Sequence, residues 1–563
     1  MNRQQTTNNR QQALDSTDNQ LEILTRESHV LREFQDDSEK VSQQGILKII
    51  ENLKFRNYVL AVSHSDYLIS LGGTEKVLHE EQAELAKHNI SYIQVYSSGL
   101  SDEYAKKKYL NQLTGVNVDS VPVGKFTVVQ LGLILQILSL SGTANAVATH
   151  IHHLMKMSVP GVKHLINAAQ AHKLRIFLHD YYTICPQINL LKNGREFCGG
   201  PPVNSSECGE CGWKEARHLH FRMVSTLFKS VDAEFMTPSR VAAGICGNSF
   251  PELANHIRVV PHQIRHPYNG NKAKSAEDVA VPGYYPKIAY IGYESVVKGL
   301  ETWWRLTSES RIQEQYELFH LGASGMNIQG VKYIPVSFLE KGPDAMTDAL
   351  RKYQIDIAFL WSICPETYSF SVNEAFAANC FVVTNKFSGN IADQVKETGR
   401  GVVFNDETEM FDFFKDVSRV KQAVRINLQE NSLLDLKFNP ELSIELADLL
   451  NKEENPHVDK DSKNIFHEKS SEWYYLLRKL EAETNRADQI AYLEGLTDIE
   501  LKTQLDVYRI SKLHIFVEYV RNVMNKNPVI RRTSKKILLA VWNTVISLHK
   551  NGLKIIRQIK GER

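Results

Sequence analysis

Short apolar runs recur along the chain between Tyr58 and Thr384, and each is followed by a loop or a helical segment. Runs of this kind are typical of buried strands, and their alternation with helices predicts parallel sheets covered by helices on both faces. The predicted strands are Tyr58–Ser63, Ser91–Tyr96, Ala146–Ile151, Arg175–Leu178, Glu234–Met236, Ile257–Val260, Lys287–Ile291, Glu317–Leu321, Ile355–Leu360 and Phe381–Thr384. These are enough strands for two sheets, so we expect an α/β fold built from two Rossmann-like, doubly wound domains.

The boundary between the two domains is predicted where Pro, Gly, Asn and Lys collect, over Pro261–Asp278. The ends of the chain differ in character from this α/β region, because residues 1–20 are polar and residues after 452 are highly charged. We therefore expect a disordered or helical extension over 1–55, a first domain over 56–265, a second over 266–451, a linker over 452–470 and a helical extension over 471–563.

One uncharged stretch, Phe126–Met155, is long enough to span a bilayer. It contains glutamine, serine, glycine, asparagine and three histidines, and its apolar block Phe126–Leu140 is only about four turns long. We interpret it as a buried helix, a Ser-Gly-Thr break and then the strand Ala146–Ile151. The first 45 residues contain no apolar run that would serve as a secretory signal.

The overall charge excludes several classes of protein. The 563 residues include 66 Lys or Arg and 65 Asp or Glu, which gives a net charge of +1. With 42% apolar residues, the chain is an ordinary globular protein and neither a disordered polymer nor a polycation that coats nucleic acid. Seven cysteines in this length indicate a reducing compartment, and we expect a cytoplasmic protein.

The positive charge gathers at the C-terminus, where residues 526–563 contain ten Lys or Arg and one acid, Glu562. Apolar positions there share one helical stripe: Leu538, Val541, Val545, Leu548, Gly552, Ile555 and Ile559. A basic amphipathic helix of this kind fits the surface of the inner face of a membrane, which would make the protein a peripheral one. The alternative is a helix packed on its own domain or on a partner chain. Nucleic acid is not expected as a partner, because no aromatic platform accompanies the charge.

Two glutamates flank the start of a predicted helix that follows the run Ile355–Leu360. Pro365 marks a loop and residues 369–378 a helix, so Glu366 lies at the mouth of the helix and Glu374 about two turns into it. Open α/β sheets bind ligands at the carboxyl ends of their strands, and a helix N-terminus favours phosphate. Carboxylates beside a diphosphate can accept hydrogen bonds from sugar hydroxyls. On spacing alone the pair could equally be two solvated glutamates, since acidic pairs are common on helices.

The segment Pro365–Ala378, read with Phe381–Asn385, resembles the E-x7-E signature of retaining glycosyltransferases of family 4, which have the GT-B fold. Three other segments resemble motifs of that family: the glycine loop Gly72-Gly73, the strand Ile288–Gly292 with Lys298-Gly299, and the loop Ser388–Val395, which has Asp393 where Glu is usual. Their order agrees over roughly residues 57–450, about 70% of the chain.

The resemblance implies a role for each matching residue at the donor. Glu374 would hold the ribose hydroxyls of the nucleotide, Glu366 would contact the donor sugar, and Lys298 would neutralise the diphosphate. Ser369 and Phe370 would offer backbone N–H groups to the diphosphate.

The first domain would contribute two further features by the same resemblance. Gly72 and Gly73 would let the backbone approach the phosphate or the acceptor, which a side chain would block. His179, at the end of the strand Arg175–Leu178, matches a family histidine that faces the reacting sugar.

The chain departs from the family pattern after Gly292. The family usually has an Arg there as a partner of the Lys, whereas this chain has Tyr293-Glu294. One cation is therefore missing from a site that must stabilise a leaving diphosphate. Arg265, in the interdomain region, is a candidate substitute.

The resemblance implies an enzyme that transfers a hexose-type sugar from a nucleotide-sugar to a saccharide or lipid-linked acceptor, in cell-surface polysaccharide synthesis. The alternative is a GT-B scaffold or binding protein of a glycan-assembly complex that has weak or no activity. The single Asp-x-Asp sequence, Asp459-Lys460-Asp461, lies in the predicted linker and outside both predicted sheets, so no catalytic metal is expected.

Four cysteines lie in a segment rich in glycine and proline, with the spacing C-x12-C-x9-C-x2-C. They are Cys185, Cys198, Cys208 and Cys211. Four thiolates that end in C-x2-C suit a closed, structural zinc site, and the segment resembles a cysteine insertion of a subgroup of the family. An iron–sulfur cluster and four reduced thiols remain alternatives.

Three histidines end the predicted strand Ala146–Ile151. The period of two places His150 and His152 on one face and His153 on the other. We expect a hydrogen-bonded role at the strand end for them rather than contact with an acceptor.

Overall fold

The computed structural model describes residues 45–443 except 46, 99–111, 141, 204, 271–273 and 326–327, together with residue 458. The chain divides into two compact units, residues 1–485 and 486–563. The second unit lies outside the described residues. So do most of the predicted extension over 1–55, all but one residue of the predicted linker over 452–470, the helical extension over 471–563 and the basic segment 526–563.

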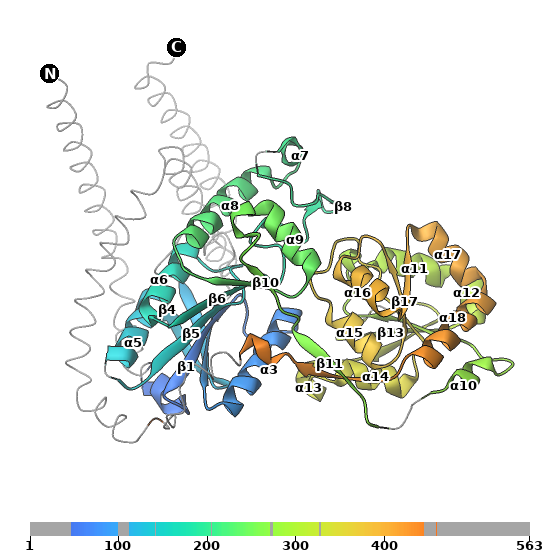
Figure 1. The fold of residues 1–563 in the computed structure, drawn as a ribbon, viewed down its shortest axis with the longest axis horizontal. Coiled ribbons are helices and arrows are strands. Elements are labelled where there is room, and N and C mark those ends of the chain that lie inside the picture. The colour runs from blue at the N-terminus through green and yellow to red at the C-terminus, as the bar shows by residue number, and fades with distance from the viewer. Residues whose placement is uncertain are drawn as a thin grey trace, which may run out of the picture. The chain divides into compact units, whose positions relative to one another are not determined.

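The first sheet has eight strands in the order β10-β9-β6-β5-β1-β2-β3-β4 (Figure 1). Its strands are β1 (Asn57–Ser63), β2 (Ser91–Ser97), β3 (Leu113–Val118), β4 (Val121–Thr127), β5 (Asn145–Ile151), β6 (Lys173–Phe177), β9 (Glu234–Thr237) and β10 (Ile257–Val259). The six strands that the sequence predicts here pair in parallel. Burial shows why β1 is apolar throughout. Tyr58, Leu60 and Val62 face one core cluster, and Val59 and Ala61 face another.

The edge of this sheet differs from the prediction of a wholly parallel sheet. Strands β3 and β4 form a hairpin that pairs antiparallel to β2. The hairpin turns at Asp119 and Ser120, which both have positive φ. Strand β4 is half exposed, so it lacks the apolar run that predicts the other strands. Phe126, near its end, is part of the apolar block that the sequence analysis interprets as a helix.

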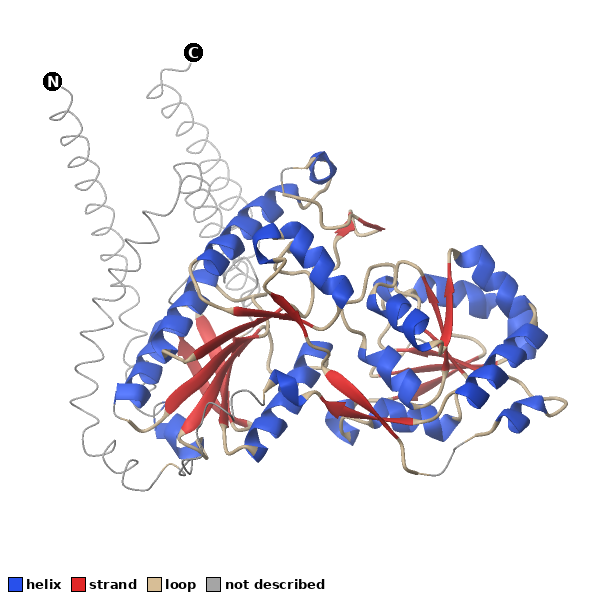
Figure 2. Cartoon of the chain, viewed as in Figure 1, coloured by secondary structure: helices blue, strands red, loops and turns tan. Residues whose placement is uncertain are grey.

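The second sheet is entirely parallel and has six strands in the order β14-β13-β12-β15-β16-β17. They are β12 (Lys287–Ile291), β13 (Glu317–Gly322), β14 (Val331–Pro335), β15 (Ile357–Phe359), β16 (Phe381–Asn385) and β17 (Gly401–Phe404). Here too alternate residues face opposite cores, with Ile288 and Tyr290 in one and Ala289 and Ile291 in the other. Both sheets are therefore doubly wound, as predicted for the GT-B fold, and Figure 2 shows helices on both faces of each.

The helices complete the two halves. Those of the first half are α3 (Gly73–Lys87), α5 (Val128–Leu140), α6 (Val159–Ala169), α7 (Ser206–Gly209), α8 (Lys214–Lys229), α9 (Arg240–Ser249) and η2 (Pro251–Leu253). Those of the second half are α10 (Ala276–Ala280), η3 (Val296–Lys298), α11 (Leu300–Ser308), α12 (Ser310–Gln315), α13 (Phe338–Lys341), α14 (Ala345–Tyr353), α15 (Phe370–Ala377), α16 (Asn390–Thr398), α17 (Glu407–Lys415) and α18 (Val417–Glu430).

Helix α5 is the apolar block that raised the question of a membrane span. It has 13 residues, and eight of them lie in the core of the first sheet: Val128, Val129, Leu131, Leu133, Ile134, Leu135, Ile137 and Leu138. The prediction of a buried helix is confirmed. In the described part of the chain, no helix combines the length and the apolar character that crossing a bilayer requires.

Two segments join the halves. Strand β11 (Gln263–Pro267) pairs antiparallel with β18 (Leu434–Phe438), which comes after the second sheet. The chain then returns to the first sheet in η4 (Pro440–Leu442), where Leu442 packs with Phe177 of β6. The carbonyl of Leu442 accepts a hydrogen bond of 2.7 Å from the buried Arg175. Two chain segments therefore hold the carboxyl end of the first sheet beside the second.

The first core extends further towards the N-terminus than the sequence suggests. Residues 47–52 are helical, and Ile49, Ile50 and Leu53 pack in the core of the first sheet. The two-stranded pair of β7 (Leu191–Lys192) and β8 (Glu196–Phe197) lies within the cysteine segment.

Candidate functional site

Glu366 lies in the loop that follows β15, at the carboxyl end of the second sheet. Its N–H donates to the carbonyl of Ser388 over 3.2 Å, and its carbonyl accepts from the N–H of Asn390 over 3.0 Å. The loop before α16 therefore fixes the backbone of Glu366. Gly389 makes this approach possible. Its φ is 63°, and a Cβ there would lie 2.6 Å from the Cα of Pro365.

Lys298 reaches the same place from the other side of β15. Gly299, which follows it, has a φ of 81°, and a Cβ there would lie 2.1 Å from the carbonyl oxygen of Trp361. This close contact seats η3 against the end of β15, so that Lys298 Nζ lies 3.3 Å from Glu366 Oε1. The Glu366 carboxylate raises the pKa of Lys298 above its usual value. The structure thus brings these two predicted residues together.

Helix α15 begins directly after this loop. Ser369 is its N-cap, with a φ of 63°, and its hydroxyl accepts a hydrogen bond from the N–H of Val372 over 3.4 Å. The first N–H groups of a helix have no intrahelical partner, and an anion is stabilised there by the helix dipole. Ser369 and Phe370 therefore stand where the sequence places them, at a helix start suited to phosphate.

Glu374 lies within α15, and its carboxylate is buried against a lysine of the first half. Lys76 Nζ lies 2.7 Å from Glu374 Oε1, and the two side chains are 6% and 9% exposed. The same Nζ donates to the carbonyl of Pro343 over 2.9 Å and lies 4.8 Å from the centre of the Phe370 ring. Burial opposes the charge of Lys76, but Glu374 and Glu80 outweigh it and raise the pKa of Lys76.

Lys76 is the main residue of the site that the sequence analysis missed. It stands in the first turn of α3, where the helix dipole disfavours a cation. A lysine at that position, three residues after the glycine loop, is the signal that could have identified it.

The glycine loop touches the donor-side helix. Gly72 is the N-cap of α3 and Gly73 its first residue. A Cβ at Gly73 would lie 3.6 Å from the Phe370 ring, which is ordinary van der Waals contact. The loop predicted in the first domain therefore meets the start of α15.

Arg265 lies on β11 and contacts α15 at a different place. Its Nε and Nη2 donate to Asn373 Oδ1 over 3.0 and 2.7 Å, and its guanidinium lies 4.9 Å from the centre of the Phe376 ring. Burial lowers the pKa of Arg265. Its hydrogen bonds to Asn373 do not place it beside Lys298.

The two residues that follow Gly292 differ in their contacts with Lys298. Tyr293 is 57% exposed, and its ring centre lies 5.8 Å from Lys298 Nζ. Glu294 accepts a hydrogen bond from Ser324. Besides Lys298, Lys76 lies near the start of α15, with its Nζ 4.8 Å from the centre of the Phe370 ring.

His179 is part of a row of buried imidazoles. Its Nε2 lies 3.0 Å from Nδ1 of His152, and its Nδ1 lies 3.3 Å from Nε2 of His262. Burial, with His262 and His152 close by, holds the pKa of His179 well below its usual value. Its carbonyl accepts a hydrogen bond from Thr367 in the loop before α15. Both ring nitrogens of His179 are therefore engaged within the protein.

The predicted faces of the neighbouring histidines are confirmed. His150 Nδ1 and His152 Nε2 lie 2.7 and 2.9 Å from the two oxygens of Glu81, on one side of the sheet. His153 instead pairs with Asp180 over 2.8 Å. These contacts are the hydrogen-bonded role expected at the strand end.

Arg217 of α8 interacts with three of the four cysteines of the predicted zinc segment, namely Cys185, Cys198 and Cys208. Cys208 accepts a hydrogen bond from Arg217, which also donates to the carbonyls of Ile184 and Pro201. Burial raises the pKa of Cys185 to about 11 and also raises that of Cys198, and the charge of Arg217 acts against both shifts. Within the described ranges, no three of these sulfurs lie within 4.8 Å of one another. The zinc site thus stays a prediction.

One set of metal-type ligands is gathered in the described part of the chain, namely Glu81, His150 and His152. Their separations are hydrogen-bond distances between ring nitrogens and carboxylate oxygens, and Tyr92 also donates to Glu81 over 2.7 Å. A network of hydrogen bonds accounts for this cluster.

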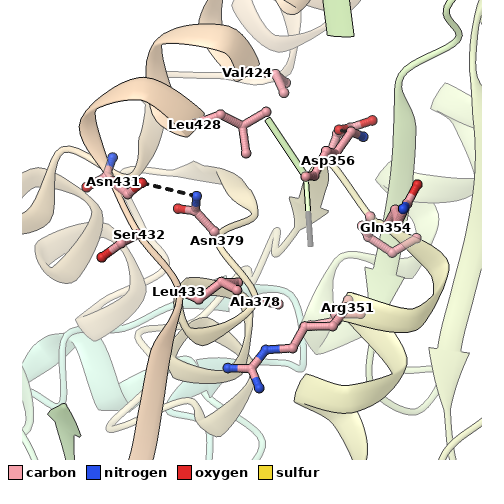
Figure 3. A pocket seen from close by; sticks show the side chains of 13 residues that line it. Arg351, Gln354, Asp356, Ala378, Asn379, Val424, Leu428, Asn431, Ser432 and Leu433 are labelled. Carbon is pink, nitrogen blue, oxygen red and sulfur yellow. Dashed lines mark hydrogen bonds and ion pairs between the residues drawn. The ribbon is translucent and has the colours of Figure 1, made fainter. Parts of the chain in front are cut away.

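A separate small pocket lies in the second half, away from these residues (Figure 3). Asp356 lines it just before β15, and Ala378 and Asn379 line it just after α15. The pocket therefore lies at the amino end of β15, opposite Glu366. Ligands of open α/β sheets bind at the other end.

No protein-family model and no curated protein matches this sequence. Several solved structures resemble it, and they are glycosyltransferases. Sucrose-phosphate synthase from Thermosynechococcus elongatus is 12% identical, with 70% of this chain and 98% of that one covered and a TM-score of 0.41. HepE from Anabaena, solved with UDP-glucose, is 13% identical over 70% and 100%, with a TM-score of 0.40. WaaG, a glycosyltransferase involved in lipopolysaccharide biosynthesis, is 9% identical over 70% and 100%, with a TM-score of 0.38. At these values the likenesses assign no residue and no substrate to this chain.

Proposed function

We propose that this protein is a retaining glycosyltransferase of the family 4 type that moves a sugar from a nucleotide-sugar to a saccharide or lipid-linked saccharide. The observation that carries the proposal is the Lys298–Glu366 contact of 3.3 Å beside the start of α15. A cation, a carboxylate and free helix N–H groups meet there at the carboxyl end of a parallel sheet. That combination suits a diphosphate joined to a sugar.

The roles follow from the charges. Lys298 and the N–H groups at Ser369 and Phe370 would neutralise the diphosphate as it leaves, which is the main electrostatic demand of the reaction. Glu366 would accept hydrogen bonds from the donor sugar. Glu374, two turns along the helix, would accept them from the ribose. The contacts of Gly73 and Lys76 with this helix support a site that both halves complete.

The acceptor and the location belong to the same proposal. The basic residues of 526–563 favour a protein at the inner face of a membrane, where a lipid-linked acceptor of cell-surface polysaccharide synthesis would be available. The protein would be cytoplasmic and would need no catalytic metal.

The test is donor turnover by Lys298→Ala and by Glu366→Ala, measured as release of nucleoside diphosphate with UDP-, GDP- and ADP-sugars. Each variant should lose at least about 100-fold in kcat, the scale of removing one charge-stabilising group. Lys332→Ala is the matched control, because Lys332 pairs with Glu317 over 3.0 Å in the same half at an exposed site. Rates close to wild type in both site variants would exclude the assignment.

One observation favours a second function, that of a scaffold that keeps the fold without catalysis. Lys76 forms an ion pair with Glu374, whose carboxylate would have to accept the hydrogen bonds of the ribose, and the pair is almost fully buried. A scaffold would show no hydrolysis of any donor in the absence of an acceptor, whereas a transferase is expected to hydrolyse its donor slowly. Measurable hydrolysis that Lys298→Ala removes would exclude the scaffold.

A further inference from the structure

The carboxylate of Glu81 is the anchor of a hydrogen-bond network inside the first half. Glu81 lies on α3 and is 0% exposed. Its oxygens lie 2.7 Å from the Tyr92 hydroxyl, 2.7 Å from His150 Nδ1 and 2.9 Å from His152 Nε2. An ionised carboxylate can only accept hydrogen bonds, so each of these three groups must donate.

The position of the proton on each histidine ring determines its position on the next ring in the row. A neutral imidazole carries one N–H and one lone pair. For a neutral His152 that donates from Nε2, the Nδ1 is an acceptor, and His179 must donate to it from Nε2 over 3.0 Å. The Nδ1 of His179 is then also an acceptor, and His262 must donate to it from Nε2 over 3.3 Å. This sequence of donors leaves the lone pair of His262 on Nδ1.

That last nitrogen is buried and finds no hydrogen-bond partner among the residues the structure describes. His262 is 4% exposed, and burial lowers its pKa to about 3, which keeps the ring neutral. A buried acceptor without a partner is unfavourable, so a nitrogen held in this state is prepared for a donor.

The backbone at His262 is fixed on both sides. The Asn439 side chain donates to the carbonyl of Pro261 over 2.9 Å, and the Asn439 N–H donates to the carbonyl of His262 over 2.9 Å. The N–H of Gln263 donates to the Tyr368 hydroxyl over 3.0 Å. The ring is thus held at a set position beside the loop that starts α15.

We propose that His262 contacts the bound donor, its Nδ1 accepting a hydrogen bond from a hydroxyl of the sugar, while Glu81, His152 and His179 are positioning residues that fix its tautomer. The identity of the ligand rests on the proposed function, whereas the tautomer does not.

The rings around His262 indicate where this hydroxyl would come from. Its ring centre lies 4.7 Å from that of Tyr368 and 5.9 Å from that of Phe370. Tyr368 lies just before the N-cap of α15, and Phe370 is the first residue of the helix. A nucleotide-sugar with its diphosphate at this helix start would have its sugar beside these rings. Sugar hydroxyls are hydrogen-bond donors, and a diphosphate at neutral pH is not.

The tautomer is tested in the free protein at pH 8 by 15N NMR of histidine-labelled chain, with His262→Phe to assign the signal. The wild type should show Nδ1 of His262 unprotonated. Glu81→Gln, which removes the anion that sets the direction, should give a population protonated at Nδ1. Glu84→Gln, on the same helix but in contact with the exposed Lys87 and with His88, should leave the His262 signal unchanged. A protonated Nδ1 in the wild type would overturn the proposal, whether or not Glu81→Gln folds.

The ligand is tested by comparing UDP, GDP and ADP with the corresponding nucleotide-sugars. One nucleotide-sugar should shift the Nδ1 signal, and its parent nucleotide should not. His262→Phe should bind that nucleotide-sugar about tenfold more weakly and the nucleotide unchanged. An equal shift with both ligands, or unchanged affinity in the variant, would overturn the contact. If none of the six ligands binds the wild type, the proposed function fails and the sugar contact with it, while the tautomer result stands separately.

Discussion

At the scale of single residues, the site depends on buried charges whose partners come from distant parts of the sequence. Glu366, Glu374 and Lys298 could be proposed for the site from the sequence, because each lies in a segment with a recognisable pattern. It could not identify Lys76 as the partner of Glu374, because 298 positions separate them and no local pattern records such a pair. The sequence likewise could not predict that both ring nitrogens of His179 contact other histidines, because His152 and His262 meet His179 only in the folded structure.

The Lys76–Glu374 pair predicts a strong coupling in stability. Lys76→Ala and Glu374→Ala should each lower the free energy of unfolding by about 3 kcal/mol, because each leaves a buried charge without its partner. The double variant should lose much less than the sum, as measured by urea unfolding in a double-mutant cycle. The exposed pair Lys332–Glu317, with side chains 64% and 40% exposed, should show a coupling below about 1 kcal/mol. Additive effects at Lys76 and Glu374 would contradict the buried contact.

Glu80, one turn after Lys76, predicts a dependence of stability on pH. Burial raises the pKa of Glu80 to about 7, although Lys76 and Gln263 act against it. An acid with a raised pKa holds its proton longer in the folded state, so stability falls as the pH rises from about 4.5 to about 7. Glu80→Gln should remove this fall and be more stable than wild type at pH 8 by about 1 kcal/mol or more, with little difference at pH 4. Urea unfolding at both pH values measures it, and equal stability at pH 8 would argue against the burial.

At the scale of elements, the apolar runs predicted six strands of the first sheet and four of the second, because a strand buried on both faces is apolar throughout. The outer strands β14 and β17 and the hairpin β3–β4 were missed, since β14, β17 and the edge strand β4 are partly exposed. The position of η3 and of the loop before α16 could not be predicted either. Each depends on a close approach of a glycine to another segment, Gly299 to Trp361 and Gly389 to Pro365. These partners are known only from the folded structure.

Gly389 tests the contribution of such a glycine. Gly389→Ala places a Cβ 2.6 Å from the Cα of Pro365, so the loop that carries Glu366 must shift. Gly399 at the other end of α16 is a control for positive φ, because its φ is 67° and a Cβ there meets nothing within 4 Å. Its ψ is 9°, against −123° at Gly389, so Gly389→Ala adds backbone strain as well as the contact. Gly399→Ala should cost only the backbone strain, about 1–2 kcal/mol. Gly389→Ala should cost more in thermal unfolding and also weaken donor binding, and equal effects of the two variants would contradict the assigned contact.

The cysteine segment carries a prediction about metal. If Cys185, Cys198, Cys208 and Cys211 form a zinc site, the purified chain should contain about one zinc per molecule by elemental analysis. Cys208→Ser and Cys211→Ser should each lose it and lower the melting temperature, whereas Cys246→Ser, at a buried thiol outside the segment, should keep the zinc. A zinc-free wild type would leave Arg217 as the group that holds the segment together.

At the scale of the molecule, two doubly wound sheets joined near Pro261–Asp278 could be predicted as a class of fold, because alternation of strands and helices is a local property of the sequence. The second connection, through β18, could not be predicted. How the halves meet could not, since the contacts of Gly73 and Lys76 with α15, and of Leu442 with Arg175, join residues far apart in the chain. The proposed site draws on both halves, so its chemistry depends on those contacts.

The central claim is that the start of α15, with Lys298, Glu366 and Glu374, binds a nucleotide-sugar. A thermal-shift measurement with UDP-, GDP- and ADP-sugars on the wild type and on Glu374→Ala tests it most directly. At a free ligand concentration of about 100 Kd, binding adds about 2.7 kcal/mol of stability. We predict that donors of one nucleotide class raise the melting temperature of the wild type and not that of Glu374→Ala. No shift with any donor, in a wild-type protein that unfolds cooperatively, would contradict the donor site and favour the scaffold.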